Sequence, residues 1–430
     1  MKGAAVTAMV VLWAGSALAA PGVGPSLSGT VSMLDTHPGD QTDPHVSGDW
    51  VAYTGELNGG SGIRFRNLAT DVAGAVPLDG GGMDFLSDLS GSTLLYTHLT
   101  QAGSAVFAFN LSTDGPAVEL SPRPGSNRRS AAVGGRTVAW QDYGFNAGLL
   151  APEIVVFDSF SRRTTRLTSN AKLDKNPAVS PDGDTVVWTQ CQTRSEGCAV
   201  WRALYADGSW SSAALTGSEG EASMPDTDGR QVVYASSRPG GRDLYWQTLP
   251  SGPEQRLAIA GDDSNPAISG NLIAFEHRDP TSPTPNGDVW LYDLDTEAVY
   301  ALTDSPVDET LNDISVSTDG LVRVVWTAGE EDYNVYAFSF RMGTRGPASL
   351  DGTLRLKGCM SGSRRVLRGS PTVRVDPRTR RLSVSPEPPS LARVQACGEA
   401  GGPPSFLTLL LVGRFFLSLL RPPKSRFPRA

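Results

Sequence analysis

Short runs of β-branched and apolar residues, each ending in an aromatic side chain, recur along most of the chain. There are seven such runs, and the aromatic residues that end them lie 41 to 51 positions apart. These aromatic residues are Tyr53, Tyr96, Trp140, Trp188, Tyr234, Phe275 and Trp326. Branched and aromatic residues favour β-structure, so the pattern predicts one strand that is repeated at a near-constant period.

A second, alternating strand follows each run after a polar loop. In DVWLYDL (288–294) and NVYAFSF (334–340), apolar side chains occupy every second position, as a half-buried strand requires. Turn sequences such as PDGD (181–184) supply the residues that tight hairpins need. A short segment before the run, such as PAVS (177–180), and another after the alternating strand, such as AVYALT (298–303), complete four strands in most copies.

Four antiparallel strands repeated around an axis form the blades of a β-propeller. The seventh copy ends after NVYAFSF without a fourth strand, whereas residues 30–35 have the form of a fourth strand at the start of the sequence. We therefore predict an all-β, seven-bladed β-propeller that is closed by an N-terminal strand. Six or eight blades are alternatives, because the copies between residues 79 and 169 match least well, and a pair of β-sandwiches is the competing architecture.

Several copies also resemble a known family of repeats. NPAVSPDGDTVVWTQ (176–190) and MPDTDGRQVVYASSRPGGRDLYWQTLPSG (224–252) are similar to the core motif of TolB-type, WD40-like propeller repeats, and residues 311–338 form a looser copy. The resemblance implies a propeller from about residue 30 to residue 340. The family includes six-bladed periplasmic partners of outer-membrane systems and propeller domains attached to serine peptidases. Seven copies differ from the six of TolB itself, so the resemblance implies a fold more than a role.

Charge divides the chain into two unlike parts. The 430 residues include 37 Lys and Arg against 45 Asp and Glu, which gives a formal net charge of −8. Acidic residues dominate up to residue 340, and basic residues dominate from Arg341 onward. We predict an acidic propeller at residues 21–341 and a basic, largely irregular C-terminal tail that begins with an Arg/Pro-rich linker at residues 342–396. The acidic propeller argues against a nucleic-acid partner.

Both ends of the chain carry targeting patterns. Lys2, the following apolar stretch and the small residues before Ala20 predict a signal peptide at residues 1–20. Residues 397–430 combine a cysteine, an apolar run and a basic end, and they resemble the C-terminal sorting tails of some bacterial surface proteins. Cys397 is then the candidate for processing, and the tail would associate the protein with a membrane. The expected location is the periplasm, the cell surface or the outer membrane.

Four cysteines are present, and disulfides persist in exported proteins. Cys191 and Cys198 flank a turn-like segment, and we predict a disulfide between them, with two free, partly buried thiols as the alternative. Cys359 and Cys397 lie in the basic C-terminal part.

The sequence contains no G-x-S-x-G nucleophile motif, no H-E-x-x-H metal motif and no phosphate-binding glycine loop. Structural or solvent-exposed roles are expected for His37 and His45. Candidate binding groups are instead carboxylates near the start of six of the seven copies, in passages that gather on one face of a propeller; the passage of the third copy is basic, with Arg128 and Arg129. They are Asp40, Asp43, Asp84, Asp174, Glu219, Glu221, Asp262, Asp263, Asp308 and Glu309. Such a ring would focus a negative field, although Asp is also common in turns for backbone reasons.

These observations predict an exported binding scaffold for a protein or glycan partner at the bacterial envelope, which uses the acidic, loop-rich face. A polysaccharide lyase or hydrolase with its site at the channel mouth is the alternative, and a structural module that only presents the tail is a third reading. Enzymatic activity is the less expected outcome. No cofactor is predicted; calcium would suit several carboxylate oxygens, but no EF-hand-like string supports it.

Overall fold

The computed structural model describes residues 26–342, except 58, 78–80, 114, 146–150, 239–240, 283–284 and 331, together with two short segments at 372–375 and 382–385. The chain divides into two compact units, residues 1–345 and 346–430, and each is treated by itself. Every helix or strand element in the described residues is a β-strand.

Seven antiparallel sheets of four strands make up the first unit. The first blade contains β2 (Gln41–Ser47), β3 (Trp50–Leu57), β4 (Gly60–Asn67) and β5 (Ala73–Ala75). The second contains β6 (Met83–Ser90), β7 (Thr93–Thr100), β8 (Gly103–Asn110) and β9 (Val118–Glu119). The third contains β10 (Arg128–Gly134), β11 (Thr137–Asp142), β12 (Glu153–Asp158) and β13 (Arg163–Arg166). The fourth contains β14 (Leu173–Val179), β15 (Thr185–Cys191), β16 (Ala199–Ala206) and β17 (Ser209–Ala214).

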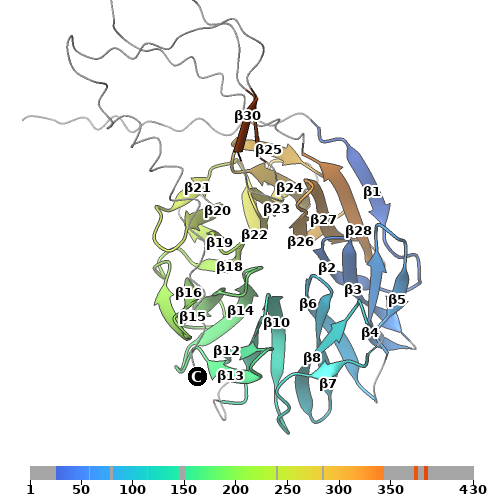
Figure 1. Cartoon of the computed structure of the whole chain (residues 1–430), viewed down its shortest axis with the longest axis vertical. Coiled ribbons are helices and arrows are strands. Elements are labelled where there is room, and N and C mark those ends of the chain that lie inside the picture. Colours follow the sequence, from blue (N-terminus) through green and yellow to red (C-terminus); the bar gives the residue numbers. More distant parts are fainter. Residues whose placement is uncertain are drawn as a thin grey trace, which may run out of the picture. The chain divides into compact units, whose positions relative to one another are not determined.

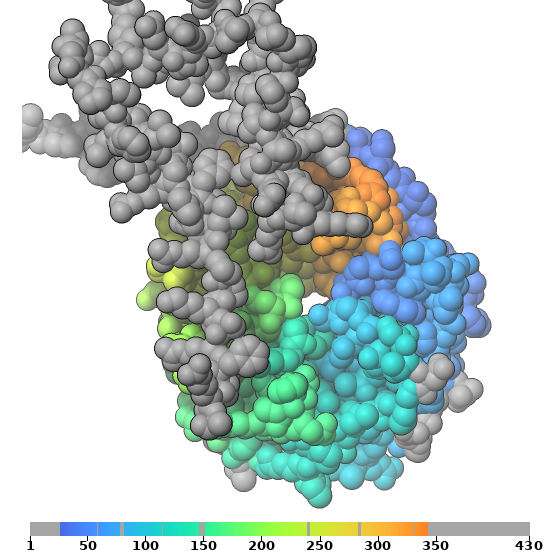
Figure 2. Space-filling view, in the orientation of Figure 1, coloured from blue at the N-terminus to red at the C-terminus, as the bar shows by residue number. Residues whose placement is uncertain are grey.

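The remaining three blades follow the same order. The fifth contains β18 (Ala222–Thr227), β19 (Gln231–Arg238), β20 (Gly241–Thr248) and β21 (Gln255–Leu257). The sixth contains β22 (Asp262–Ser269), β23 (Leu272–Arg278), β24 (Asp288–Asp293) and β25 (Ala298–Ala301). The seventh contains β26 (Glu309–Val316), β27 (Leu321–Ala328), β28 (Asn334–Arg341) and β1 (Gly29–Met33). The first strand of each blade lies nearest the centre of the ring (Figure 1), and a central opening is visible in Figure 2.

The prediction of an all-β, seven-bladed propeller is confirmed, and neither six or eight blades nor paired sandwiches describe this ring. Its closure is confirmed as well. Strand β1 pairs antiparallel with β28, from Gly29 opposite Phe340 to Met33 opposite Tyr336. Residues near the two ends of the propeller sequence therefore share one sheet, which leaves no gap between the last blade and the first.

The hydrophobic core is divided into clusters that lie between neighbouring blades. The aromatic residues that end the seven sequence runs are all buried, and Trp140, Trp188, Tyr234 and Phe275 have no exposed surface. Trp140 packs with Leu95 and Val106 of the second blade, in addition to residues of its own blade. The recurrence of these aromatics in the sequence thus reflects one repeated packing contact between adjacent sheets.

Each innermost strand contains a shift in register with its neighbour. In five blades a residue at this bulge has a positive φ, including Asn176 (54°) and Asn265 (48°). Asn tolerates the left-handed region better than most residues, and a proline follows it in both places, which explains the Asn-Pro pair in the sequence motif. A bulge changes the direction of the side chains that follow it, and here these side chains line the centre of the ring.

In the second unit, β29 (Thr372–Val375) and β30 (Leu382–Ser385) form an antiparallel pair. The predicted signal peptide, Cys359, Cys397 and the C-terminal segment at 397–430 lie outside the described residues, as does nearly all of the linker, and these assignments stay predictions. No helix among the residues that the structure describes is long and apolar enough to cross a membrane.

Leu34 provides a test of ring closure. Its side chain is 3% exposed and packs against Val46 of the first blade and Val335 of the seventh, and its N–H donates to the Val335 carbonyl at 2.9 Å. Leu34→Ala should lower the free energy of unfolding by about 2–5 kcal/mol, because it leaves a cavity between these blades. Val31→Ala, at a side chain that is 57% exposed on the same segment, is the control. Equal urea midpoints for the two variants would contradict the packing role of Leu34.

Candidate functional site

A central cavity of about 450 Å³ is lined by the innermost strands of all seven blades. Four titratable side chains line it: His45 on β2, Asp88 on β6, Asp226 on β18 and Asp313 on β26. Each stands at the same place in its strand, directly after the bulge and directly before Val46, Leu89, Thr227 or Ile314. In the other three blades this place is held by Ala132, Ala178 and Ala267. At this position the channel wall therefore carries a titratable side chain on four blades and an alanine on the other three.

His45 lies between the carboxylates of two neighbouring blades. Its Nδ1 atom is 3.4 Å from Asp88 Oδ1 and 3.5 Å from Asp313 Oδ2, and each of the three side chains is about one-fifth exposed. Burial disfavours a charged imidazole, but the hydrogen bonds with Asp313 and Asp88 outweigh it and hold the pKa of His45 well above its usual value. Burial raises the pKa of Asp313. An imidazole and two carboxylates thus meet beside the closure of the ring.

The channel carboxylates also join the blades to one another. Asp88 Oδ2 accepts the Val133 N–H at 2.6 Å, Asp226 Oδ2 accepts the Ile268 N–H at 2.7 Å, and Asp313 Oδ2 accepts the Val46 N–H at 3.0 Å. In every case the donor belongs to the next blade. These bonds fix the orientation of the carboxylates, so the channel wall is held in place before any ligand arrives.

A serine two positions further along the strand repeats this arrangement. The hydroxyl oxygens of Ser47, Ser269 and Ser315 accept N–H groups of the following blades at 2.8–3.0 Å. The serines that end PHVS (44–47) and PAIS (266–269) are therefore explained by contacts between blades rather than by a chemical role.

Asp226 lies on the channel wall away from the closure. Burial raises its pKa to about 7, and the negative charges of Asp313 and Asp88 contribute in the same direction. Its protonation state therefore changes near neutral pH.

A groove continues from the channel onto the second blade. This cavity of about 510 Å³ shares His45, Ser87 and Ser130 with the channel wall. We call it the entrance groove and define it by Asp43, Phe85, Leu86, Leu99 and Arg129. Phe85 is 38% exposed, and the adjacent Met83 on the same strand is 44% exposed. Because Phe85 and Asp43 lie near the beginnings of innermost strands, the groove opens on the face where the predicted acidic loops gather.

Five of the ten predicted carboxylates are exposed on that face: Asp40, Asp43, Glu219, Asp262 and Asp308. Asp43 borders the entrance groove and accepts a hydrogen bond from the Asn312 amide at 3.1 Å. Asp40 accepts the Tyr333 N–H at 3.0 Å, and Asp308 forms an ion pair with Arg278 at 2.7 Å. Asp43 is the one among these five that lines the groove or the channel.

The other five carboxylates have partners within the blades. Asp84 contacts His98 Nδ1 at 2.6 Å, and Asp263 contacts His277 Nδ1 at 2.7 Å. Asp174 accepts hydrogen bonds from Trp188, Gln190 and Asn170 at 2.7–2.9 Å. Glu309 is 7% exposed, and burial raises its pKa. Asp84, Asp174, Asp263 and Glu309 all stand four residues before the channel position, so their recurrence has a structural origin, and a binding role for them stays a prediction.

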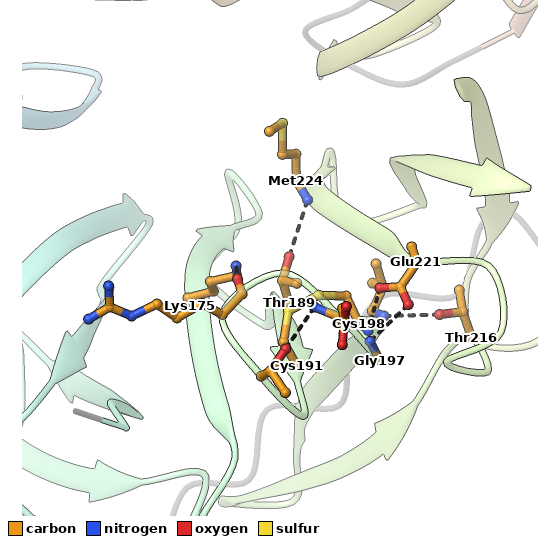
Figure 3. The surroundings of a disulfide bond; sticks show 12 residues. Lys175, Thr189, Cys191, Gly197, Cys198, Thr216, Glu221 and Met224 are labelled. Carbon is orange, nitrogen blue, oxygen red and sulfur yellow. Dashed lines mark hydrogen bonds between the residues drawn. A yellow bond between two sulfur atoms is a disulfide. The ribbon is translucent and has the colours of Figure 1, made fainter. Parts of the chain in front are cut away.

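The fifth, Glu221, supports a disulfide loop (Figure 3). The predicted bond between Cys191 and Cys198 is confirmed, with Cα atoms 4.0 Å apart. The Glu221 carboxylate accepts the N–H groups of Gly197 and Cys198 at 2.8 and 2.9 Å. The loop between β15 and β16 is thereby tied to the start of the fifth blade.

Sequence reasoning missed the central groups. It expected a structural or exposed role for His45 and did not select Asp88, Asp226 or Asp313, because it searched the loops rather than the strands. A signal was present: all four residues occupy one repeat position, directly before Val46, Leu89, Thr227 or Ile314.

No family model and no curated protein matches this chain. Among solved structures, oligogalacturonate lyase from Vibrio parahaemolyticus is similar with a TM-score of 0.54 at 13% identity, over 74% of this chain and 95% of that chain. The β-propeller domain of the Trilobed protease from Pyrococcus furiosus gives 0.52 at 12% identity, over 72% of this chain and 99% of that domain. TolB from Acinetobacter baumannii gives 0.41 at 16% identity, over 68% and 80%. The first two likenesses place the chain in the class of β-propeller proteins, which is a statement about fold alone.

Asp226 predicts a pH dependence of stability. Its pKa is about 7 in the folded chain and about 3.9 when unfolded. The folded state therefore binds the proton more tightly, and stability falls as the pH rises between these two values, then levels off above about 7. Asp226→Asn cannot ionise, yet its side-chain oxygen can still accept the Ile268 N–H. Between pH 5 and pH 8 in metal-free buffer, the wild type should lose about 2.5 kcal/mol more unfolding free energy than this variant. The control is Asp207→Asn at an exposed turn, which should lose as much unfolding free energy as the wild type. If Asp226→Asn also loses as much between pH 5 and pH 8 as the wild type does, Asp226 is not the group responsible.

The disulfide predicts a second effect on stability. Joining two residues seven positions apart restricts the unfolded chain, so replacing both Cys191 and Cys198 with Ala should cost about 2–3 kcal/mol. Reduction of the wild type should produce the same shift in the urea midpoint. The matched control replaces Cys359 and Cys397 with Ser and should unfold at the wild-type midpoint. A Cys191→Ala, Cys198→Ala variant as stable as the wild type would show that the bond does not constrain the fold.

Proposed function

We propose that this propeller is an exported binding scaffold of the cell envelope, which holds an extended segment of a protein partner in the entrance groove and directs it toward the channel. One observation carries the proposal: a groove with both apolar and charged walls continues from the channel on the loop-rich face. Concave surfaces that combine apolar walls with placed polar groups are the usual form of a binding site.

The walls of the groove suit a peptide with both apolar and polar side chains. Phe85 and Leu99 offer apolar surface, while Asp43 and Arg129 supply opposite charges at its borders. Met83 and Phe85 leave a substantial part of their side chains in water, and neighbouring exposed apolar residues on a folded surface commonly mark a contact site. A partner would cover them.

The charge of the channel favours a cationic end to that segment. Three carboxylates, Asp88, Asp226 and Asp313, line the channel together with one imidazole. A Lys or Arg that enters from the groove would meet an excess of negative charge in a confined space, where attraction is less screened than at the surface. Charge complementarity of this kind increases association rates and excludes acidic partners.

The location at the envelope is part of the proposal. The N-terminal pattern of residues 1–20 is that of a secreted chain, and the Cys191–Cys198 disulfide suits an oxidising compartment. Two alternatives place a different molecule in the same groove. One is a glycan ligand, and the other is a polysaccharide substrate of a lyase or hydrolase. Each is tested separately below.

The test places a photo-crosslinking amino acid at position 85 in the groove, and at position 160 in the control. Phe160 is 86% exposed in the turn between β12 and β13, which the strand order places on the opposite face. In cells that produce the protein, position 85 should give a discrete protein adduct and position 160 should not. With the captured partner purified, Phe85→Ser should weaken binding by about tenfold or more, whereas Phe160→Ser should not. Adducts at both positions, or at neither, would contradict the proposal.

The enzymatic alternative is measured on the same protein. The full chain is incubated with oligomers of acidic and neutral polysaccharides, and new reducing ends or unsaturated products are recorded. Turnover that is lost in Phe85→Ser would support the lyase or hydrolase in place of the scaffold. If an oligomer binds at position 85 without being cleaved, the ligand of the groove is a glycan and not a protein segment.

A further inference from the structure

Three potential metal ligands meet on the channel wall. The nearest ligand atoms of His45, Asp88 and Asp313 all lie within 4.8 Å of one another, and no other group of three such residues is found in the part of the chain that the structure describes. From this geometry we infer that the channel binds a divalent transition-metal ion, with Zn²⁺ as the best fit, between the imidazole of His45 and the carboxylates of Asp88 and Asp313.

The distances match the requirements of such an ion. Bonds of about 2.0–2.1 Å at the tetrahedral angle separate two ligand atoms by about 3.3–3.4 Å. His45 Nδ1 lies 3.4 Å from Asp88 Oδ1 and 3.5 Å from Asp313 Oδ2. Two of the three ligand pairs therefore already stand at the spacing of a four-coordinate site, and the ligand atoms of the third pair lie within 4.8 Å of each other.

The donor set selects the class of ion. Imidazole nitrogen with carboxylate oxygen suits zinc and its first-row neighbours, whereas Ca²⁺ takes oxygen ligands and usually six to eight of them. The two carboxylates supply two negative charges, which a divalent ion neutralises when the imidazole is neutral. With the ion bound, Asp226 is the remaining channel carboxylate for a cationic group of a partner. The chemistry of the site and the charge of the ion thus agree.

The ligands are held in orientation by backbone groups behind them. Asp88 accepts N–H groups from Leu89 at 2.7 Å and Val133 at 2.6 Å. Asp313 accepts N–H groups from Ile314 at 2.7 Å and Val46 at 3.0 Å. Outer hydrogen bonds of this kind fix metal ligands in position and typically affect affinity tenfold or more. Each carboxylate oxygen has a further lone pair available for the ion.

The location of the site gives the ion a structural consequence. Its ligands come from β26, β2 and β6, which are the innermost strands of the seventh, first and second blades. Strand β1 completes the seventh blade and leads directly into β2 of the first, so the ring closes beside this boundary. An ion here would link three consecutive blades across that boundary, and this linkage requires no partner protein.

The competing explanation is a protonated imidazole that pairs with both carboxylates and leaves no room for an ion. The two explanations differ in a direct measurement. The full chain is prepared metal-free with Cys359→Ser and Cys397→Ser, so that tail thiols do not bind metal, and is titrated with Zn²⁺, Mn²⁺ and Ca²⁺ in equilibrium dialysis. Co²⁺ is used as a spectroscopic probe, because its visible absorption reports four-coordinate geometry.

One Zn²⁺ per chain is expected, with weaker Mn²⁺ and little Ca²⁺ binding. His45→Asn and Asp88→Asn should each weaken Zn²⁺ binding by about tenfold or more and remove the four-coordinate Co²⁺ spectrum. The control is His37→Asn, since His37 is an exposed histidine that also contacts an aspartate, Asp35, and it should bind as the parent does. Urea midpoints in chelator identify variants that fail to fold.

Three results would overturn the inference: no stoichiometric Zn²⁺ in the parent, equal affinity in a folded His45→Asn variant, or a six-coordinate Co²⁺ spectrum that both channel variants retain. Because the titration uses the isolated chain, its failure leaves the proposed partner groove untouched, and failure of the crosslinking experiment leaves the metal site untouched.

Discussion

The contact between adjacent blades is the interaction on which the rest of the structure depends. A four-stranded sheet with short outer strands, such as the two-residue β9, cannot bury both of its faces alone. Each blade covers one face of the next, and the residues that do so, including Trp140 and Trp188, are fully buried. A ring built in this way gains its final contact only when the last blade meets the first. The pairing of β1 with β28 brings the last sheet to full size, and Leu34 fills the boundary beside it.

Hydrogen bonds from side chains to the backbone of the next blade accompany this packing. They follow the channel, where the apolar layers end and backbone N–H groups would otherwise lie unsatisfied. Asp88, Asp226 and Asp313 serve one row of donors, and serines serve a second row. The polar lining of the channel is therefore first a solution to a backbone problem. The negative charge of the channel is a consequence of using carboxylates for this structural role, and the entrance groove opens beside them.

The repeat was readable from sequence because its cause is local and recurs seven times. One aromatic residue per blade must fill the space between sheets, and hairpin turns must separate the strands, so both leave a periodic signal. The closing strand could be predicted for a related reason: the seventh copy lacks a fourth strand, and residues 30–35 have the form of an additional strand before the first copy. The Cys191–Cys198 bond could be predicted because a separation of seven residues places the two cysteines close together near the ends of two strands that a short loop joins.

The candidate site was less readable, because carboxylates with different roles look alike in a sequence. Asp174 and Asp43 both lie in the first half of an innermost strand, yet Asp174 is enclosed by Trp188 and Gln190 whereas Asp43 borders the entrance groove. The difference depends on the bulge, because Asp174 is paired with the next strand before it whereas Asp43 lies within it. A single sequence without the register of the sheet does not contain that information. His45 was missed for the same reason, since its neighbours Asp88 and Asp313 are 43 and 268 residues away along the chain.

The channel position also explains why function could arise on some blades and not on others. The residue after the bulge lines the channel and also touches the next blade, since Ala132, Ala178 and Ala267 pack with the hydrophobic clusters between blades. Alanine satisfies the position in three blades, while an acid gains one hydrogen bond to the next blade. Such a position can change its chemistry without loss of the fold. The three neighbouring blades that carry His45, Asp88 and Asp313 are the ones beside the ring closure and the entrance groove. A substitution of the side chain at this position in these blades would therefore affect both the closure of the ring and the wall of the entrance groove. In this way one position of a structural repeat can acquire a binding site.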